Sequence, residues 1–444
     1  MTADETSGDP LGTLRRESAE ITAALIQIDS TNTGDPATIS DGESRCAELI
    51  RELLSEAGYE GQWCERTPGR GNLVVRIAGT DPAAPALLIH AHTDVVPADP
   101  ALWRADPFGG EIIDGELWGR GAVDMKNMIG MLLAAIRSLG IEGWQPRRDI
   151  VLAFVADEEV EGADGMAYLV AEHPELFRGV TEAIGEVGGF SFEAPTGRNY
   201  AIGIGEKGVA WATLRARGVE GHGSLIPNSK SALARLTAAL ARITAHSWPL
   251  ANDPATDTVL THLGDALGSS VSAQSIEQDL VPLGPVAPMF SSAFRTSSAL
   301  TQVHAGSKTN TVPGIAMATV DCRIAPGYET EFHRVFAELV GPDVEVSWES
   351  APSVTAEYDT ELVAAVCRAI TAVDPGARAI PFVTGGATDA KALSRRGIRC
   401  YGFVPLCLPA GFNFPGMFHG IDERVPVASL ETGAVILREL LLSQ

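Results

Sequence analysis

The sequence lacks any apolar run close to the roughly 20 residues that a membrane-spanning helix requires. Its cysteines form no CxxC pair and no zinc-finger spacing, which excludes the common structural zinc modules. The six are scattered along the chain: Cys46, Cys64, Cys322, Cys367, Cys400 and Cys407. Such scatter favours buried, reduced side chains over disulfides, so we expect a soluble protein of a reducing compartment.

Positive charge is also scarce. Lysine and arginine number 33 against 57 aspartates and glutamates, and the formal net charge is −24. A surface of that sign repels nucleic acid and anionic membranes, so we expect neither as a partner. The segment Met1–Pro10 is polar and acidic, without the basic and apolar regions of a secretory signal, and this predicts a cytoplasmic protein.

The sequence does have length and a regular alternation of predicted strands and helices. At 444 residues it exceeds one ordinary core. Nearly continuous apolar strands alternate with amphipathic helices, which is typical of an α/β fold whose mostly parallel sheet is flanked by helices. Residues 207–350 follow a β-α-β-β-α-β order instead. We predict one domain from residues 1–206 and 351–444, with a small α+β domain inserted at 207–350. The Ser-, Gly- and Pro-rich segment Thr256–Leu300 exceeds that plan and has no assigned role.

The first half of the chain pairs imidazole with carboxylates. Apolar residues 86–89 lead into His92 and Asp94, which share one face of an extended segment because strand side chains alternate. Asp124 ends a Gly-rich turn directly before a predicted helix. Imidazole and carboxylate groups near strand ends are ligands that zinc uses. This stretch therefore predicts half of a metal site.

Three more acids and a histidine follow other predicted elements. The apolar strand 150–156 runs through Asp157 into Glu158 and Glu159, so one glutamate can bind metal while its neighbour takes a proton from water. Glu186 ends the next predicted strand, and His419 lies far along the chain. Taken singly, Glu158 and Glu159 also fit a solvated acidic turn, Glu186 fits a turn cap, and His419 fits a core histidine.

Six motifs in order resemble one family. They are HTDVVP, GRGAVDMK, DEE, an acid near a glycine pair, GHGS and FHGIDE, between Ala86 and Val427. The family is the di-zinc metallopeptidase family of aminoacylase, acetylornithine deacetylase, succinyl-diaminopimelate desuccinylase, carboxypeptidase G and carnosinase. The resemblance implies a zinc-peptidase-like fold with an inserted dimerisation and lid domain, and a cis peptide after Asp124. Two positions depart from the family pattern. Asn127 stands where the family usually has glycine, and Val187 stands where many members have proline or glycine.

The resemblance implies two Zn²⁺ per subunit, for which Co²⁺ or Mn²⁺ can substitute. Five residues would be the ligands: His92, Asp124, Glu159, Glu186 and His419. Asp124 would bridge the two ions, with His92 and Glu186 completing one site and Glu159 and His419 completing the other. The ions would be co-catalytic.

Three catalytic roles also follow from the resemblance. Glu158 would be the general base, and Asp94 would accept a hydrogen bond from His92 and fix its tautomer. His222 would reach across a homodimer and stabilise the oxyanion in the partner's site, although a helix-start residue beside Ser224 is the plainer interpretation.

The resemblance places four further residues near the substrate: Asn310, Arg323, Gly386 and Thr388. Arg323 suits a bidentate grip on a free carboxylate, while an ion pair with Asp321 is the structural alternative. His90, Asp389 and Lys391 are interpreted as structural residues.

These expectations together describe a metal-dependent amidohydrolase or peptidase. A hydroxide bridging the metals would cleave the amide bond of an N-acyl amino acid or of a short peptide with a free carboxylate. A carnosinase-type dipeptidase is the alternative among enzymes, and a non-catalytic metal-binding relative is the alternative from another class. Glu158 beside Glu159 disfavours the latter, since a binding protein needs no general base.

Overall fold

The computed structural model describes residues 10–160, 162–250 and 253–444. Residues 1–9, which hold most of the acidic N-terminal segment, lie outside the described residues. Among the helices in the described ranges, none is both long and apolar enough to cross a bilayer.

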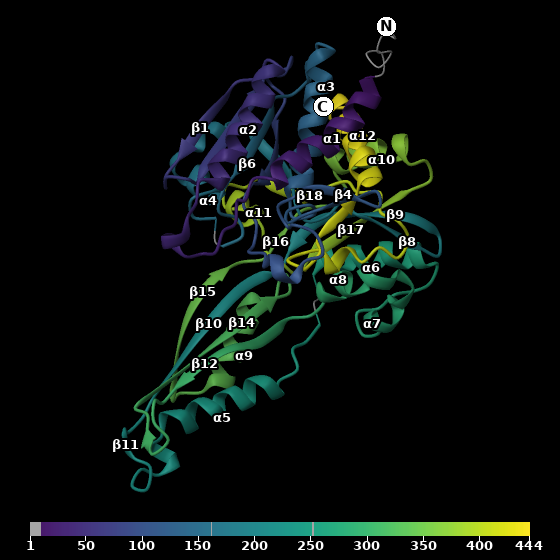
Figure 1. Ribbon diagram of the computed structural model, residues 1–444. Coiled ribbons are helices and arrows are strands. Elements are labelled where there is room, and N and C mark those ends of the chain that lie inside the picture. Colours follow the sequence, from purple (N-terminus) through teal and green to yellow (C-terminus); the bar gives the residue numbers. More distant parts are fainter. Residues whose placement is uncertain (1–9, 161, 251–252) are drawn as a thin grey trace.

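A mixed sheet of ten strands forms the centre of the larger part of the molecule (Figure 1). Its strands are β1 (Gly61–Glu65), β2 (Gly71–Ile77), β3 (Ala86–His92), β6 (Ile150–Val155), β7 (Val180–Gly185), β8 (Ser191–Ala194), β9 (Gly197–Glu206), β16 (Val354–Thr355), β17 (Arg378–Thr384) and β18 (Arg399–Gly402). The order is β1-β2-β6-β3-β7-β18-β9-β16, and β8 and β17 also pair with β9. β6, β3, β7 and β18 are mutually parallel. The predicted α/β class with a mainly parallel sheet is confirmed.

Helices cover both faces of this sheet because its strands are apolar on both. The main helices are α1 (Pro10–Ile26), α2 (Gly42–Glu56), α3 (Lys126–Ile141), α10 (Glu361–Val373) and α12 (Val427–Leu442), and the opposite face carries α4 (Met166–Glu172) and α11 (Ala390–Ser394). In β3, Leu87 and Ile89 enter the first core and Leu88 enters the second. This alternation is what a period of two residues requires. α3 is buried on nearly every side because α1 and α12 pack on it.

A second, antiparallel sheet projects from the larger part (Figure 1). Its order is β12 (Ser297–Ala305), β14 (Ile315–Ile324), β10 (Gly208–Arg217) and β15 (Val344–Ala351), and α5 (Ala232–Ala245) and α9 (Glu329–Val340) pack on it. Its own core includes Leu214, Leu236, Phe332 and Phe336. In chain order the elements read β-α-β-β-α-β. The short strands β11 (Gly221–His222) and β13 (Thr311–Val312) pair with each other, and β11 lies at the far tip of this projection.

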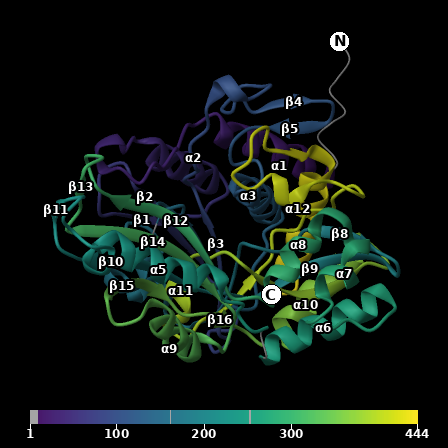
Figure 2. The ribbon, with the colours of Figure 1, turned by 90° about the horizontal axis from the view of Figure 1, so that it is seen from below.

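The Ser-, Gly- and Pro-rich segment around residues 256–300, to which the sequence assigned no role, packs on the larger sheet. It contains α6 (Pro254–Leu267), α7 (Ile276–Asp279) and α8 (Ala287–Ser292), and α6 and α8 contact β17. Val259, Leu263 and Phe290 belong to the larger core. Figure 2 shows these helices beside β8, β9 and α10, apart from α5 and β10. The domain boundaries at 207 and 350 remain a proposal. Residues 254–292 fall between these boundaries in the sequence, but their buried apolar side chains belong to the larger core.

A three-stranded sheet joins distant parts of the chain. β5 (Glu116–Trp118) pairs with β4 (Glu111–Ile113) on one side and with β19 (Arg424–Pro426) on the other. The turn that leads to Asp124 therefore lies beside the segment that follows His419.

Candidate metal centre

Three adjacent parallel strands deliver side chains to one edge of the large sheet. His92 is the last residue of β3, Glu186 directly follows β7, and Glu158 and Glu159 follow β6. Because β6, β3 and β7 are neighbours and parallel, their carboxyl ends meet at this edge. Open α/β sheets place their ligands at such an edge.

Asp124 lies between two groups of possible ligands. Its Oδ1 is 3.1 Å from Nε2 of His92, and its Oδ2 is 3.4 Å from Nε2 of His419. Glu186 Oε2 completes the first group at 3.6 Å from His92 Nε2, and Glu159 Oε2 completes the second at 3.0 Å from His419 Nε2. In each group of three, the ligand atoms lie within 4.8 Å of one another. The sequence-predicted ligands are thus brought together, with Asp124 shared.

Two peptide bonds beside these ligands are cis. The Asp124–Met125 bond is one of them, as the resemblance implied, and Glu186–Val187 is the other. His419 has a φ of +55°, in the left-handed region that few residues other than glycine adopt.

Burial and mutual proximity shift the pKa values of these groups strongly. Burial raises the pKa of Glu186 to about 7, although His92 partly offsets the effect. Burial alone would raise the pKa of Asp124, but hydrogen bonds from His419 and His92 hold it well below its usual range. Hydrogen bonds to Asp124 and Glu159 raise the pKa of His419 to about 10. The cluster of acids therefore favours positive charge at its centre.

The residues present fit divalent cations. Among the described residues, no arginine or lysine forms an ion pair with the four carboxylates Asp124, Glu158, Glu159 and Glu186. Oε1 of Glu159 is buried and has no hydrogen-bond partner, although buried polar atoms are nearly always satisfied. Two histidines and three carboxylates are a donor set that suits zinc, cobalt or manganese.

Glu158 belongs to neither ligand group, yet it faces the same space. Its side chain is 13% exposed, and its Oε2 lies 3.9 Å from Nε2 of His92. Burial, together with the Glu186 carboxylate, raises its pKa well above the ordinary value. A carboxylate with a raised pKa, next to the ligand groups but outside them, is suited to accepting and returning a proton.

Asp94 is fully buried behind the glutamate pair. Its carboxylate accepts hydrogen bonds from the backbone N–H groups of Glu158 and Glu159 at 3.1 and 3.0 Å. Nδ1 of His92 lies 3.0 Å from the backbone oxygen of Asp94 and 3.5 Å from its carboxylate. Asp94 therefore orients His92 mainly through its backbone, and its side chain orients the following loop.

Sequence reasoning missed the groups that support this loop. Asp157, with a φ of +65°, forms an ion pair with Arg70 at 2.7 Å and accepts a hydrogen bond from Asn32 at 3.0 Å. Asn32 also donates to Asp94 at 3.0 Å. Arg70 and Asn32 are buried. No spacing in the sequence marks them, because they come from loops far from the acidic motif.

His222 and Asn310 lie away from the metal centre of their own chain. His222 is exposed in β11 at the far tip of the small sheet, and its Nδ1 is 2.8 Å from the Ser224 hydroxyl (Figure 1). The backbone oxygen of Asn310 accepts a hydrogen bond from Gly223 at 2.9 Å, so Asn310 belongs to the same tip.

The other predicted substrate residues lie near the junction of the two sheets. Arg323 binds the Asp321 carboxylate at 2.9 and 3.2 Å, as the structural alternative expected. The N–H of Thr388 donates to buried Glu206 at 3.2 Å, and its hydroxyl donates to the same carboxylate. The N–H of Gly386 donates to the Thr384 hydroxyl at 3.2 Å.

The three side chains interpreted as structural are all buried. His90 lies 3.9 Å from Asp389, and burial lowers its pKa to about 4. Lys391 donates to the backbone oxygens of Lys207 and Pro352 at 2.6 and 2.9 Å, where the chain passes between the sheets.

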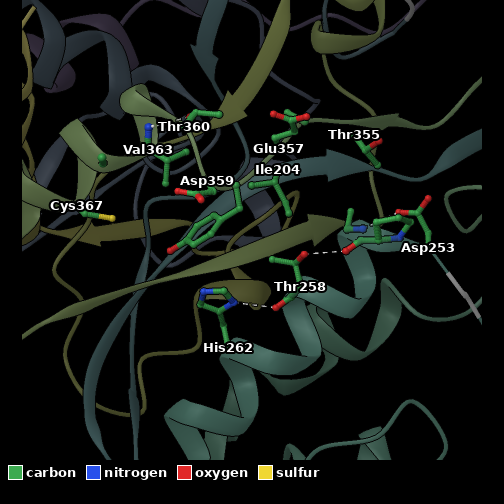
Figure 3. A pocket seen from close by; sticks show the side chains of 15 residues that line it. Ile204, Asp253, Thr258, His262, Thr355, Glu357, Asp359, Thr360, Val363 and Cys367 are labelled. Carbon is green, nitrogen blue, oxygen red and sulfur yellow. Dashed lines mark hydrogen bonds between the residues drawn. The ribbon is translucent and has the colours of Figure 1, made fainter.

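A cavity of about 850 Å³ lies between α6 and α10 (Figure 3). His262 and Thr258 line it from α6, and Val363 and Cys367 line it from α10. None of its lining residues belongs to the metal centre. The size of this cavity therefore does not mark the reaction site, which the ligand geometry places at the strand ends.

Comparison with known proteins agrees with this geometry. Residues 88–443 match the model of peptidase family M20/M25/M40. A succinyl-diaminopimelate desuccinylase of Cereibacter sphaeroides is 30% identical over 434 residues, covering 95% of this chain and 97% of the relative. The N-fatty-acyl-amino acid synthase/hydrolase PM20D1 of Mus musculus is 28% identical over 444 residues, covering 95% of this chain and 86% of the relative.

A solved structure shares the fold. The M20 family metallo-carboxypeptidase of Sulfolobus solfataricus superposes with a TM-score of 0.70 at 18% identity, covering 96% of this chain and 98% of that one. The family match spans most of the chain and includes all five of the candidate ligands. The chain therefore belongs to peptidase family M20/M25/M40.

Proposed function

We propose that this protein is a metal-dependent hydrolase of amide bonds, acting on N-acyl amino acids or short peptides that carry a free carboxylate. One observation carries the proposal: two groups of three ligands share Asp124, and Glu158 stands beside them without belonging to either. The relatives include a desuccinylase and an N-fatty-acyl-amino acid synthase/hydrolase, which supports an N-acyl substrate.

The chain's own residues divide the work as follows. His92, Asp124, Glu159, Glu186 and His419 would hold two zinc ions, or cobalt or manganese in their place. Such ions polarise a carbonyl and lower the pKa of water toward neutrality. Glu158 would take a proton from water and then return it to the leaving amine. Asp94 fixes the backbone from which Glu158 and Glu159 extend.

We propose further that the working form is a homodimer. His222 belongs to β11, which lies at the tip of the small sheet, away from the large sheet whose strand ends carry the metal centre (Figure 1). It would therefore stabilise an oxyanion in the site of a second subunit. Asn310 shares that tip and would enter the same site. Arg323 would hold the substrate carboxylate after exchanging its contact with Asp321, and Gly386 and Thr388 would line the same end. The cytoplasmic location inferred from composition stays a prediction.

The test is amine release from a panel of N-acetyl, N-succinyl and long-chain N-acyl amino acids and dipeptides, with and without a chelator. Glu158→Ala should lower turnover by orders of magnitude while the protein retains both metals, as metal analysis would report. Wild-type turnover in this variant, or no effect of the chelator on the wild type, would refute the hydrolase mechanism. Cleavage of dipeptides alone would favour the carnosinase-type alternative.

A complementation assay tests the dimer. Glu158→Ala and His222→Ala subunits, each inactive alone, would be mixed after partial unfolding and refolding together. If His222 acts in the partner's site, the mixed dimer has one intact site, and the mixture regains up to about a quarter of wild-type activity by random pairing. Activity that never exceeds the two single variants would exclude this role.

A further inference from the structure

We propose that Arg120 and Glu423 are positioning residues, whose buried ion pair sets the distance between Asp124 and His419 and thereby controls binding of the second cation. This inference rests on the proposed function, because it concerns the same metal centre. Neither residue belongs to either ligand group. They act through the main chain of the two loops that carry those ligands.

Glu423 organises the loop that leads to Asp124. Its side chain is fully buried, and its Oε1 accepts hydrogen bonds from the N–H groups of Val123 and Asp124 at 2.7 and 3.1 Å. Its Oε2 accepts a third from the N–H of Gly121 at 3.1 Å. One carboxylate therefore satisfies three backbone donors of this turn, including the N–H of the shared ligand itself.

Arg120 connects that carboxylate to the loop of His419. Its Nη1 lies 2.6 Å from Glu423 Oε2, and its Nη2 donates to the backbone oxygen of Gly420 at 3.1 Å. Gly420 directly follows His419. The guanidinium is buried, 5.2 Å from the centre of the Trp103 ring, which limits its freedom to move.

The two cation sites depend on this pair to different degrees. His92 and Glu186 extend from the ends of β3 and β7, which the sheet holds in register. Asp124 and His419 extend from loops outside the large sheet. The pairing of β5 with β19, the Arg120–Glu423 ion pair and the backbone N–H groups that donate to Glu423 hold these loops together. The second group has two of its three ligands on these loops, whereas the first has one. Loosening the pair should therefore weaken the second cation more than the first.

This role resembles that of Asp94 on the other side of the centre. Asp94 accepts the N–H groups of Glu158 and Glu159, and Glu423 accepts those of Val123 and Asp124. In both cases a buried carboxylate fixes the backbone from which ligands extend. Supporting groups of this kind tune metal affinity by about 10- to 100-fold in other proteins.

The experiment measures stepwise Zn²⁺ binding to chelator-stripped full-length protein by competition with a chromogenic chelator. Glu423→Gln and Arg120→Lys are the test variants, and His419→Ala marks the loss of the second site. We expect the first equivalent to bind within about threefold of wild type and the second to bind at least about tenfold more weakly. KM should change little, and excess Zn²⁺ should restore most of kcat.

A matched control removes another buried ion pair. Arg148 lies 3.0 Å from Glu182, and both side chains are mostly buried. Their other hydrogen bonds join Arg148 to Gln444 and Glu182 to Arg399, not to the ligands. Arg148→Met should lower the unfolding midpoint of the metal-free protein yet leave both Zn²⁺ affinities at the wild-type values. If Glu423→Gln fails to fold, Arg120→Lys decides the question.

Two outcomes would overturn the inference: wild-type affinity for both equivalents, as expected for Arg148→Met, or equal weakening of both. Failure of the proposed function is a separate result. If the wild-type protein binds two Zn²⁺ and cleaves no member of the amide panel, the hydrolase proposal fails, while the stepwise affinities still test the role of the pair.

Discussion

Replacing Asp94 with asparagine should destabilise the protein and impair turnover together. Oδ2 of Asp94 accepts from Asn32 and from the N–H of Glu159, both at 3.0 Å, and Oδ1 accepts from the N–H of Glu158 at 3.1 Å. An asparagine has one acceptor oxygen, so it can keep the first two contacts only by turning its NH₂ group toward the N–H of Glu158. A lost hydrogen bond to a charged group costs about 1.5–3 kcal/mol, and an orphaned buried donor costs about 1–3 kcal/mol. These costs overlap, and we expect a loss of about 2–4 kcal/mol in the free energy of unfolding.

The assay combines urea unfolding with steady-state kinetics. Because the N–H of Glu158 loses its partner, the general base should shift, and kcat should fall by at least about tenfold with both metals bound. Glu182→Gln is the matched control, since Glu182 is a buried acid that binds Arg148 and Arg399 at 3.0 and 3.1 Å, away from the ligands. The control should lose stability and keep its kcat. If Asp94→Asn kept wild-type stability and turnover, the role assigned to this carboxylate would be wrong.

Three further predictions concern removal of the metal, the buried side chain of Lys207, and the packing of α6 on the larger core. Chelation should abolish activity and lower the thermal midpoint, because the ions bind only the folded state, and a midpoint unmoved by the chelator would contradict the metal centre. Lys207 is buried and donates to the backbone oxygens of Ser292 and Arg295, and burial, assisted by Arg323, lowers its pKa to about 8. Between pH 8 and about 10.4 the unfolded state therefore binds more protons than the folded state, so the free energy of unfolding of the wild type should rise with pH by up to about 3 kcal/mol relative to Lys207→Met. A difference between the two proteins that stays constant across this pH range in urea unfolding would refute the prediction. Leu263→Ala, in α6, should cost about 2–5 kcal/mol because the side chain is fully buried in the larger core, whereas a loss below about 1 kcal/mol would show that this segment adds little to that core.

The sequence predicted the elements that carry a local pattern. The helix predicted directly after Asp124 appears as α3, and the strand predicted before Glu158 appears as β6, since apolar periodicity and burial agree there. His92 and Asp124 predicted half of a metal site from the residues alone, and the family resemblance added Glu159, Glu186 and His419 as the other ligands. Nothing in the Ser-, Gly- and Pro-rich composition of residues 256–300 indicated that α6 and α8 would pack on β17, since tertiary packing decides between the two cores.

The roles of the buried residues that support the ligand loops could not be predicted from the sequence, because these residues act through contacts between distant positions. Arg70 lies 87 positions from Asp157, yet the two are in direct contact. Arg120 and Glu423 stand in the GRGAVDMK and FHGIDE motifs, but their contact across 303 positions could not be predicted from either motif. A carboxylate that accepts backbone N–H groups requires no particular residue among its donors, so it leaves no periodic signal.

The ligands of the metal centre are therefore held in position in two different ways. The backbone hydrogen bonds of β3 with β6 and β7 place His92 and Glu186 at neighbouring strand ends, whereas Glu159 depends on the Asp94 carboxylate that accepts its N–H. Asp124 and His419 lie outside the strands, and their loops meet through the Arg120–Glu423 ion pair beside the pairing of β5 with β19. Small changes in those loops should alter metal affinity before they alter the fold, because the pairing of β3 with β6 and β7 remains intact while the distance between the shared ligand and the histidine changes.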